Sequence, residues 1–304
     1  MLRYPGKRGR VKILVVHDKG VLGRLLLNRL KKTHLAVTPV VISDPAHLNV
    51  EEVGQWLPDD VDVIVNAMWL SDPEPAEADP EQTRHRAFSI PLAIAEHAAA
   101  RNKVMIQLST SYVFDGRKQS AYLASNPGNP IGQLGIWQWE CEQAIRTVLP
   151  RHILLRTGWG LQRFIRKVHE SVMSMTRLNL SSRHHGQPVA SDDLARVLTA
   201  VLLQLDCGAE AWGTYQYAGA EDITQYDLAL AIAALPEFGN AARVMDALPA
   251  WAPVEPENAS LGCVRIRNTF GIKQQPWRTA LPNELVLSGL AVAEGHDLQG
   301  LQLQ

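Results

Sequence analysis

The feature that most constrains the fold is a strand-then-helix pattern that repeats along the first half of the chain. Short apolar runs bounded by polar residues alternate with stretches whose apolar residues recur at helical spacing. The runs that we expect to form strands are Val11–Val16, Val37–Ile42, Val61–Asn66 and Val104–Leu108. Parallel strands need long crossover connections, usually helices, so this alternation predicts an α/β fold: a doubly wound parallel sheet covered on both faces.

The second half of the chain continues this alternation and then becomes less regular. His152–Arg156 predicts a fifth strand, and 213–219 predicts a further one. The helices predicted from apolar periodicity are 161–176, 191–205 and 223–235. Thr224 is the expected N-cap of the last of these helices. The acidic, proline-rich stretch 67–82 predicts a mobile surface loop rather than a helix or strand.

Composition restricts the class of protein. With 304 residues and 46% hydrophobic content the chain can bury a large core, and a formal charge of -1 gives no general attraction to nucleic acid or to a membrane surface. No apolar run is long enough to span a bilayer, and we find no secretory signal. The three cysteines match neither a disulfide framework nor a zinc motif, which favours a reducing, cytoplasmic location and no metal site.

The turn after the first predicted strand has part of a phosphate-binding pattern. Glycines at 17, 20 and 23 would let the backbone approach a pyrophosphate at a helix N-terminus, but this chain has His17, Gly20 and Gly23. Asp18 places a negative charge near any bound phosphate, and Lys19 offsets part of it. Two interpretations stay open: retained dinucleotide binding at Gly20, Gly23 and Lys19, or glycines that only permit close helix–sheet packing.

Three further polar residues are candidates for contacts with a cofactor. Asp44 follows the second predicted strand, about where an acidic residue would meet a ribose, although Asp-Pro is also an ordinary turn. Asn66 ends the third predicted strand, and Ser109 ends the fourth. We expect all three to lie at the carboxyl edge of the sheet.

The stretch from Ser109 to Glu142 has the form of an active-site frame. It begins STSYVFDG, a buried strand that delivers hydroxyls to a sheet edge, and continues after a polar loop as a helix that begins near Ile131. Helical spacing places a single face of that helix at Leu134, Gln138, Cys141 and Ile145.

Several motifs in order resemble one known family. STSYVFDG is similar to STDYVFDG, ILLRTGWG to ILRTSWVYG, and HHGQPVASDDLARVL to QxGxPTxxxDLA. The segments GTYQYAGAEDITQYDLALAI and PENASLGCVRIRNTFGIKQQPWRTAL match two more motifs. All belong to the extended short-chain dehydrogenase/reductases, within the dTDP-4-dehydrorhamnose reductase (RmlD-like) family, over about 11–282. The resemblance implies a Rossmann-type domain with a smaller C-terminal substrate domain.

The resemblance also implies a chemistry whose groups are partly missing. Family members use a tyrosine as proton donor, a lysine one helical turn later that lowers the tyrosine pKa, and a Ser/Thr that orients the substrate carbonyl. An ungapped alignment of PIGQLGIWQWECEQAI with PLNVYGRSKLAGEQAV places Leu134 at the tyrosine and Gln138 at the lysine, while Thr110 is retained. Leucine cannot act as a general acid, and glutamine carries no charge to shift a neighbouring pKa.

These substitutions lead us to expect a catalytically inactive relative, a pseudo-reductase, that acts as a regulatory or assembly subunit. It would bind a nucleotide-sugar or a dinucleotide, with NAD(P) binding weakened or lost. The regulatory beta subunit of methionine adenosyltransferase shares this fold and offers a precedent. One alternative is an NAD(P)H-dependent reductase of a 4-keto deoxysugar nucleotide with Tyr112 or Tyr122 as an atypical proton donor. Another is a nucleotide or redox sensor.

A protein partner or a homodimer is also expected. Trp137 and Trp139 flank Gln138 on the altered helix, which pairs subunits in many short-chain dehydrogenases, so we interpret one as core and the other as interface.

The motifs also suggest how the chain divides into parts. A basic arm is expected at 1–10, and a tail at 283–304. The Rossmann-like domain is expected at 11–158 plus about 190–210, and the smaller domain at about 159–189 and 211–282.

Overall fold

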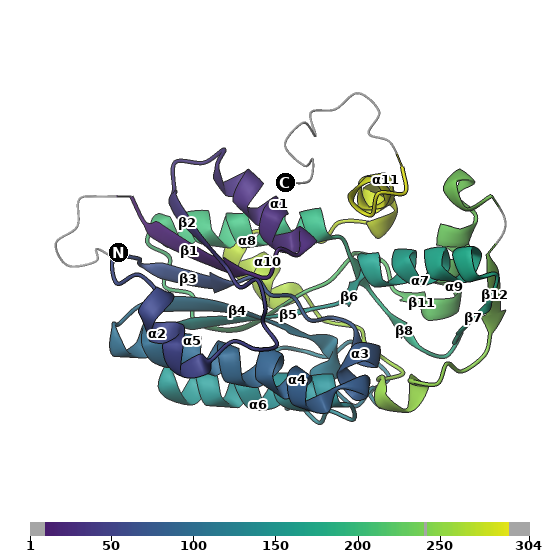
Figure 1. Cartoon of the computed structure of the whole chain (residues 1–304), viewed down its shortest axis with the longest axis horizontal. Helices are drawn as coiled ribbons and strands as arrows, with labels where there is room; N and C mark the ends of the chain where they lie inside the picture. Colours follow the sequence, from purple (N-terminus) through teal and green to yellow (C-terminus); the bar gives the residue numbers. More distant parts are fainter. Residues whose placement is uncertain (1–9, 240–241, 292–304) are drawn as a thin grey trace.

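The structure, a computed structural model, describes residues 10–239 and 242–291 and is built around one six-stranded sheet (Figure 1). All its neighbouring strands pair in parallel. Across the sheet the strands are β2 (Ala36–Val41), β1 (Lys12–His17), β3 (Val63–Asn66), β4 (Val104–Thr110), β5 (His152–Thr157) and β10 (Gly213–Tyr217). The α/β fold class predicted from the sequence is confirmed, and the arrangement is Rossmann-like.

Helices cover both faces of the sheet because its central strands are apolar on both sides. All seven residues of β4 and all four of β3 are buried. The helices on one face are α1 (Val21–Leu30), α8 (Ser191–Asp206) and α10 (Val264–Phe270). Those on the other face are α2 (Val53–Trp56), α5 (Ile90–Ala100) and α6 (Gln133–Val148). Figure 1 shows α1 and α8 above the sheet and α5 and α6 below it.

A smaller lobe lies beyond the carboxyl ends of the sheet strands and has its own apolar core. Its helices are α7 (Leu161–Ser174), α9 (Gln225–Ala233) and α11 (Trp277–Leu287). Thr224 caps α9 by accepting the Asp227 backbone N–H, as predicted. Three short strand pairs complete the lobe: β7 (Arg177–Leu180) with β12 (Arg243–Asp246), β8 (His185–Gly186) with β11 (Ile223–Thr224), and β6 (Trp159–Gly160) with β9 (Pro188–Val189).

The stretch 67–82 differs from the sequence prediction of a mobile loop without helices. It contains α3 (Pro73–Ala78) and begins α4 (Pro80–Arg84), which leads through a π-helical turn at His85–Ser89 into α5. Asp72 and Asp79 cap the two short helices by accepting backbone N–H groups, and each helix begins with proline. Proline and acidic residues, which we took as loop signals, here mark helix N-termini.

The predicted domain boundaries were wrong in two places. We expected 211–282 in the smaller domain, but β10 pairs with β5 as the edge strand of the main sheet. The tail expected from residue 283 begins inside α11, where Leu285 is buried and Glu284 accepts the Ser191 backbone N–H. The rest of the division stays a prediction. Most of the basic arm, 1–9, and the end of the tail, 292–304, lie outside the described residues.

Within the described residues no helix is long and apolar enough to cross a membrane. The three cysteines are free thiols, two of them buried. The cytoplasmic location stays a prediction.

Candidate functional site

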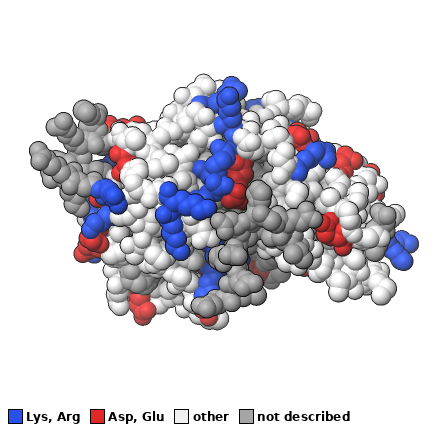
Figure 2. All heavy atoms as spheres, turned by 90° about the horizontal axis from the view of Figure 1, so that it is seen from above, with Lys and Arg blue, Asp and Glu red and all other residues white. Residues whose placement is uncertain are grey.

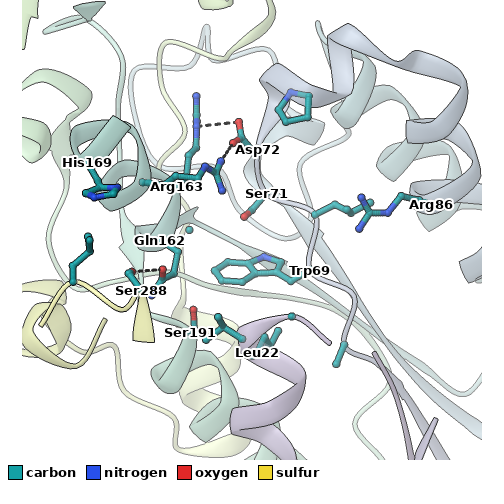
Figure 3. Close-up of a pocket in the computed structure, with 18 residues that line it drawn as sticks. Leu22, Trp69, Ser71, Asp72, Arg86, Gln162, Arg163, His169, Ser191 and Ser288 are labelled. Atoms are coloured by element: carbon teal, nitrogen blue, oxygen red, sulfur yellow. Dashed lines mark hydrogen bonds and ion pairs between the residues drawn. The ribbon is translucent and has the colours of Figure 1, made fainter. Parts of the chain in front are cut away.

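A cavity of about 660 Å³ lies at the carboxyl ends of β1, β3 and β5. The chain passes from β1 to β2 on one side and then returns to β3 on the other, so the strand order reverses here. Ligands of doubly wound sheets bind at this reversal. The residues that line it include Gly20, Trp69, Asp72, Arg86, Arg163 and Arg166. Figure 3 shows the cavity.

Trp69 forms an aromatic wall in the middle of the cavity, between Arg86 on one side and Gln162 on the other (Figure 3). Its indole N–H donates to the Thr157 hydroxyl at 2.9 Å, which fixes the ring against the end of β5. A ring held in this way offers a flat surface for stacking by a base or another planar group.

Helix α7 brings two arginines to the cavity. Arg163 and Arg166 are three residues apart and share one face of the helix, and both form ion pairs with Asp72. Arg163 also pairs with Glu255, so each of the two guanidinium groups has a carboxylate partner. Figure 2, which views the molecule from above, shows basic side chains in a band across the middle with acidic ones beside it.

The turn after β1 carries an acidic side chain next to the N-terminus of α1. Dinucleotides in this fold place their pyrophosphate at the amides of the α1 N-terminus. Here the Asp18 carboxylate accepts the Gly20 N–H at 3.2 Å and pairs with Arg86 at 3.0 Å. A carboxylate of the protein thus lies beside the helix end at which such folds bind phosphate.

His17 closes the space beneath this turn. A Cβ added at Gly23 would lie 2.5 Å from the His17 side chain, so the imidazole fills the volume that the glycine leaves. The Lys19 N–H donates to His17 Nδ1 at 3.3 Å, and Lys19 adopts a left-handed φ of 63° with its side chain exposed. Burial lowers the pKa of His17, which favours the neutral ring.

The retained threonine and the two altered positions meet where β4 ends beside α6. The Thr110 hydroxyl donates to the Gln138 side-chain oxygen at 2.5 Å, and the Gln138 amide donates to the Leu70 carbonyl at 3.0 Å. Leu134 is 2% exposed and belongs to the apolar core of the smaller lobe. Gln138, which the alignment places at the lysine position, is therefore bound to protein groups.

Gly135 allows this close packing. A Cβ added there would lie 2.0 Å from the Tyr112 carbonyl oxygen, so only glycine lets α6 approach the end of β4 so closely. The neighbouring Ser109 and Ser111 hydroxyls are buried and have no hydrogen-bond partner among the described residues.

Tyr112, one of the two substitute acids considered from the sequence, lies in a buried ionic network. Its hydroxyl donates to Glu255 at 2.9 Å and accepts from Arg163 at 2.7 Å. Arg163 also pairs with Glu255 at 2.6 Å, and Gln225 donates to the same carboxylate at 3.0 Å. Burial raises the pKa of Tyr112 well above its ordinary value. Burial also favours a protonated Glu255, but Arg163 outweighs it and lowers the pKa of that carboxyl.

Tyr122, the other candidate, is also held by protein groups. Its hydroxyl donates to Asp115 at 2.7 Å, and its ring stacks on Phe114 with centroids 4.1 Å apart. Burial raises the pKa of Tyr122. Both tyrosines are thus fixed away from the cavity lining.

The structure brings only one of the predicted cofactor-binding residues, Gly20, to the cavity wall. Asp44 is exposed and bound to His47 at 2.8 Å. Asn66 is buried, with its side chain engaged by Gln107 and by the Met68 backbone N–H. Ser109 lies in the sheet, and Lys19 points to solvent. Cofactor contacts by these four residues stay predictions.

Sequence reasoning missed the residues that contribute most to the cavity. Trp69 and Asp72 lie in the stretch that we interpreted as a mobile surface loop. Arg163, Arg166 and His169 all line the cavity from α7, and their spacing of three residues was visible in LQRFIRKVHE. That helical spacing of basic residues is the signal that could have found them.

The two tryptophans beside Gln138 make different contacts. Trp139 packs against Gly128, with Arg146 and Arg156 over its ring. Trp137 is half-buried next to Phe88, with Arg84 over its ring. A subunit interface at this helix stays a prediction.

Comparison with known proteins agrees with this geometry. The family model described as the RmlD substrate binding domain matches residues 11–287, nearly the whole described chain. The chain belongs to this family. The resemblance found in the sequence motifs is confirmed.

Two relatives show what the family includes. A dTDP-4-dehydrorhamnose reductase from Aggregatibacter actinomycetemcomitans is 26% identical over 240 residues, which cover 73% of this chain and 79% of the relative. The methionine adenosyltransferase 2 subunit beta of Mus musculus is 26% identical over 234 residues, covering 73% of this chain and 69% of that protein. One of these relatives is thus named a reductase, and the other is named a subunit of methionine adenosyltransferase.

Solved structures support the same fold. A dTDP-4-dehydrorhamnose reductase from Clostridium acetobutylicum has a TM-score of 0.78 at 22% identity, covering 92% of this chain and 100% of that one. The enzyme of that name from Bacillus anthracis, solved in complex with NADP, has a TM-score of 0.75 at 17% identity, covering 92% and 100%.

Proposed function

We propose that this chain is a non-catalytic member of its family that binds a nucleotide or nucleotide-sugar in the cavity and works as a regulatory or assembly subunit. The observation that carries the proposal is the environment of Leu134 and Gln138. A buried leucine takes the place of the proton donor, and a glutamine bound to Thr110 and Leu70 takes the place of the cation.

Loss of a proton donor alone lowers a rate on the order of 10²–10⁴, which leaves a poor enzyme rather than an inert one. Here the losses reinforce one another. Thr110 donates its proton to Gln138 instead of to a substrate carbonyl, and Gln138 brings no charge to activate another acid. NAD(P) binding is proposed to be weakened as well, because Asp18 lies at the phosphate position.

Rescue by another tyrosine is opposed by the same geometry. Tyr112 and Tyr122 each donate their proton to a carboxylate, Glu255 and Asp115 respectively. To protonate a substrate, either tyrosine would have to break this bond, and the buried or partly buried carboxylate would lose one of its hydrogen bonds.

A subunit role has support from a relative. The mouse protein similar to this chain is by name a subunit of methionine adenosyltransferase, so this family includes chains that assemble with another enzyme. We therefore propose that this chain works while bound to a protein partner or to a second copy of itself.

A second function, NAD(P)H-dependent reduction of a 4-keto deoxysugar nucleotide, is favoured by a different observation. Reductases predominate among the named relatives, with dTDP-4-dehydrorhamnose reductase the most frequent name. In this alternative the chain uses an atypical proton donor. A nucleotide or redox sensor would share the binding step but require no turnover.

The deciding experiment combines binding and turnover on the purified chain. dTDP-4-dehydrorhamnose is supplied with NADH or NADPH, and cofactor oxidation is followed against a heat-denatured control. We expect no oxidation above that control, together with measurable calorimetric binding of dTDP or a dTDP-sugar. Sustained oxidation would overturn the proposal in favour of the reductase.

A gain-of-function variant tests the cause of the loss. Leu134→Tyr with Gln138→Lys and His17→Gly restores the three altered family positions. Detectable oxidation in this triple variant, absent from the wild type, would show that missing groups and not a missing ligand site abolished turnover. Absence of both turnover and ligand binding in the triple variant would favour a purely structural subunit.

A further inference from the structure

One carboxylate sits where the fold usually receives a phosphate. Asp18 follows β1 directly, and its Oδ1 accepts the N–H of Gly20, the N-cap residue of α1, at 3.2 Å. The first-turn amides and the helix dipole make this end of α1 attractive to anions. Since no other acidic residue lies in the first turn, Asp18 is the anion that the chain itself supplies there.

Arg86 completes the internal contact from a distant segment. It comes from the π-helical turn before α5 and lines the cavity (Figure 3). Its guanidinium donates to Asp18 Oδ2 at 3.0 Å. The Asp18 and Arg86 side chains are 20% and 27% exposed, so the ion pair is partly shielded from water. A cation that could have met a ligand phosphate is thus neutralised by the protein.

The backbone holds Asp18 in this position. His17 fills the space under Gly23, and the Lys19 N–H donates to its Nδ1. Lys19 adopts a left-handed conformation that is rare for residues with a side chain. The turn is therefore fixed on both sides of Asp18, and the carboxylate is held against the N–H of the N-cap residue, Gly20.

We propose that Asp18 is a built-in anion that, together with Arg86, excludes dinucleotides from the cavity by occupying the pyrophosphate position at the N-terminus of α1. This proposal rests on the proposed function and specifies its ligand class. The cavity as folded accepts ligands that carry no phosphate at this helix end, and a pyrophosphate enters only by displacing Asp18. On this proposal, removing the negative charge of Asp18 strengthens NAD(P) binding.

Two substitutions separate the negative charge of Asp18 from its hydrogen bond. Asp18→Asn keeps a side-chain oxygen for the Gly20 N–H but removes the negative charge, whereas Asp18→Gly removes both. Asp60→Asn is the matched control, because it removes the same charge from an exposed residue at the opposite end of the sheet, next to Lys12. Calorimetric titrations with NADPH and with inorganic pyrophosphate are run on all four proteins.

We expect both Asp18 variants to bind NADPH about tenfold or more tightly than the wild type, because a like charge within a few ångströms of the phosphate is gone. The Asp60 variant should match the wild type. NADPH affinity that is unchanged or weaker in both Asp18 variants would overturn the proposal, provided that thermal unfolding shows them folded.

Arg86 provides a second, independent measurement. In the wild type this cation is neutralised by Asp18, so Arg86→Ala should change NADPH affinity less than about threefold. In the Asp18→Asn background Arg86 becomes available to the phosphate, and Arg86→Ala should then weaken binding about tenfold. Equal effects of Arg86→Ala in both backgrounds would contradict the proposed role of the ion pair.

The outcomes separate this inference from the proposed function. Turnover of dTDP-4-dehydrorhamnose by the wild type would overturn the non-catalytic function while leaving a tenfold gain in the Asp18 variants intact. Tight NADPH binding by the wild type without any gain in the variants would overturn the Asp18 inference while leaving the absence of turnover intact.

Discussion

Two regions of this protein depart from the family pattern, and they do so by different physical means. At the end of β4, Leu134 is part of an apolar core, and Gln138 is bound to Thr110 and to the Leu70 backbone. At the α1 N-terminus, Asp18 forms a partly exposed ion pair with Arg86. We propose that the first region has lost its chemistry through packing, which no ligand can reverse, and that the second is blocked by a contact with which an anion can compete.

The largest expected effect is a loss of folding stability when the buried ionic network next to the first region is broken. Glu255→Ala leaves the Arg163 guanidinium buried without its main partner and should destabilise the protein by about 3–5 kcal/mol. Glu257→Ala, two residues away in an exposed pair with Arg183, should change stability by about 1 kcal/mol or less. Urea unfolding of both variants measures the difference. Equal destabilisation would show that the buried network does not fix Tyr112.

Leu134→Ala tests whether residue 134, which the alignment places at the family's tyrosine, belongs to the apolar core. Because Leu134 is 2% exposed, the truncation should destabilise by about 2–4 kcal/mol without changing dTDP-sugar affinity. Leu123→Ala, at a leucine that is 48% exposed, is the control. A large loss of ligand affinity with little loss of stability would place residue 134 in the binding site and weaken the comparison.

Gln138→Ala removes one hydrogen bond to Thr110 and one to Leu70. We expect destabilisation of about 1–2 kcal/mol, since the Thr110 hydroxyl and the Leu70 carbonyl lose their partner. Gln143→Ala, at an exposed position of the same helix, should be near neutral. If Gln138→Lys proved as stable as the wild type, the site would still accommodate a cation, and its chemistry would be easier to restore than we propose.

The smallest effect concerns the turn at His17. Burial lowers the pKa of His17 in the folded state below its ordinary 6.5. The folded state therefore disfavours protonation, so stability is complete above pH 6.5 and is lost as the pH falls toward the lowered folded value. His97 and His152 also have pKa values lowered by burial and contribute in the same direction. His17→Gln should reduce the fall in melting temperature between pH 7 and 5. If the fall is as large as in the wild type, His17 does not contribute to it.

Much of the fold could be predicted from local pattern, because apolar periodicity reports burial directly. The strand runs were placed within two residues or so of their observed ends, and the parallel sheet follows from their alternation with helices. The boundaries between the two lobes were harder to predict from the sequence. The β10 strand joins the main sheet after the chain has passed through the smaller lobe, and no local signal in GTYQYAG records its partner.

The candidate site was only half predictable. The sequence by itself determined which chemical groups are absent, since Leu134 cannot protonate a substrate and Gln138 carries no charge in any conformation, and His17 cannot serve as a glycine. It also determined the family, through motifs that keep their order along the chain.

Only the tertiary structure decided what replaced those groups. Asp18 meets Arg86 across 68 positions, and Tyr112 meets Glu255 across 143. Such pairs depend on how the strands are ordered and how the lobes pack, and local periodicity carries no information about either. For this reason the opening of the chain showed a weakened phosphate turn, whereas the folded protein shows a turn with its own anion already in place.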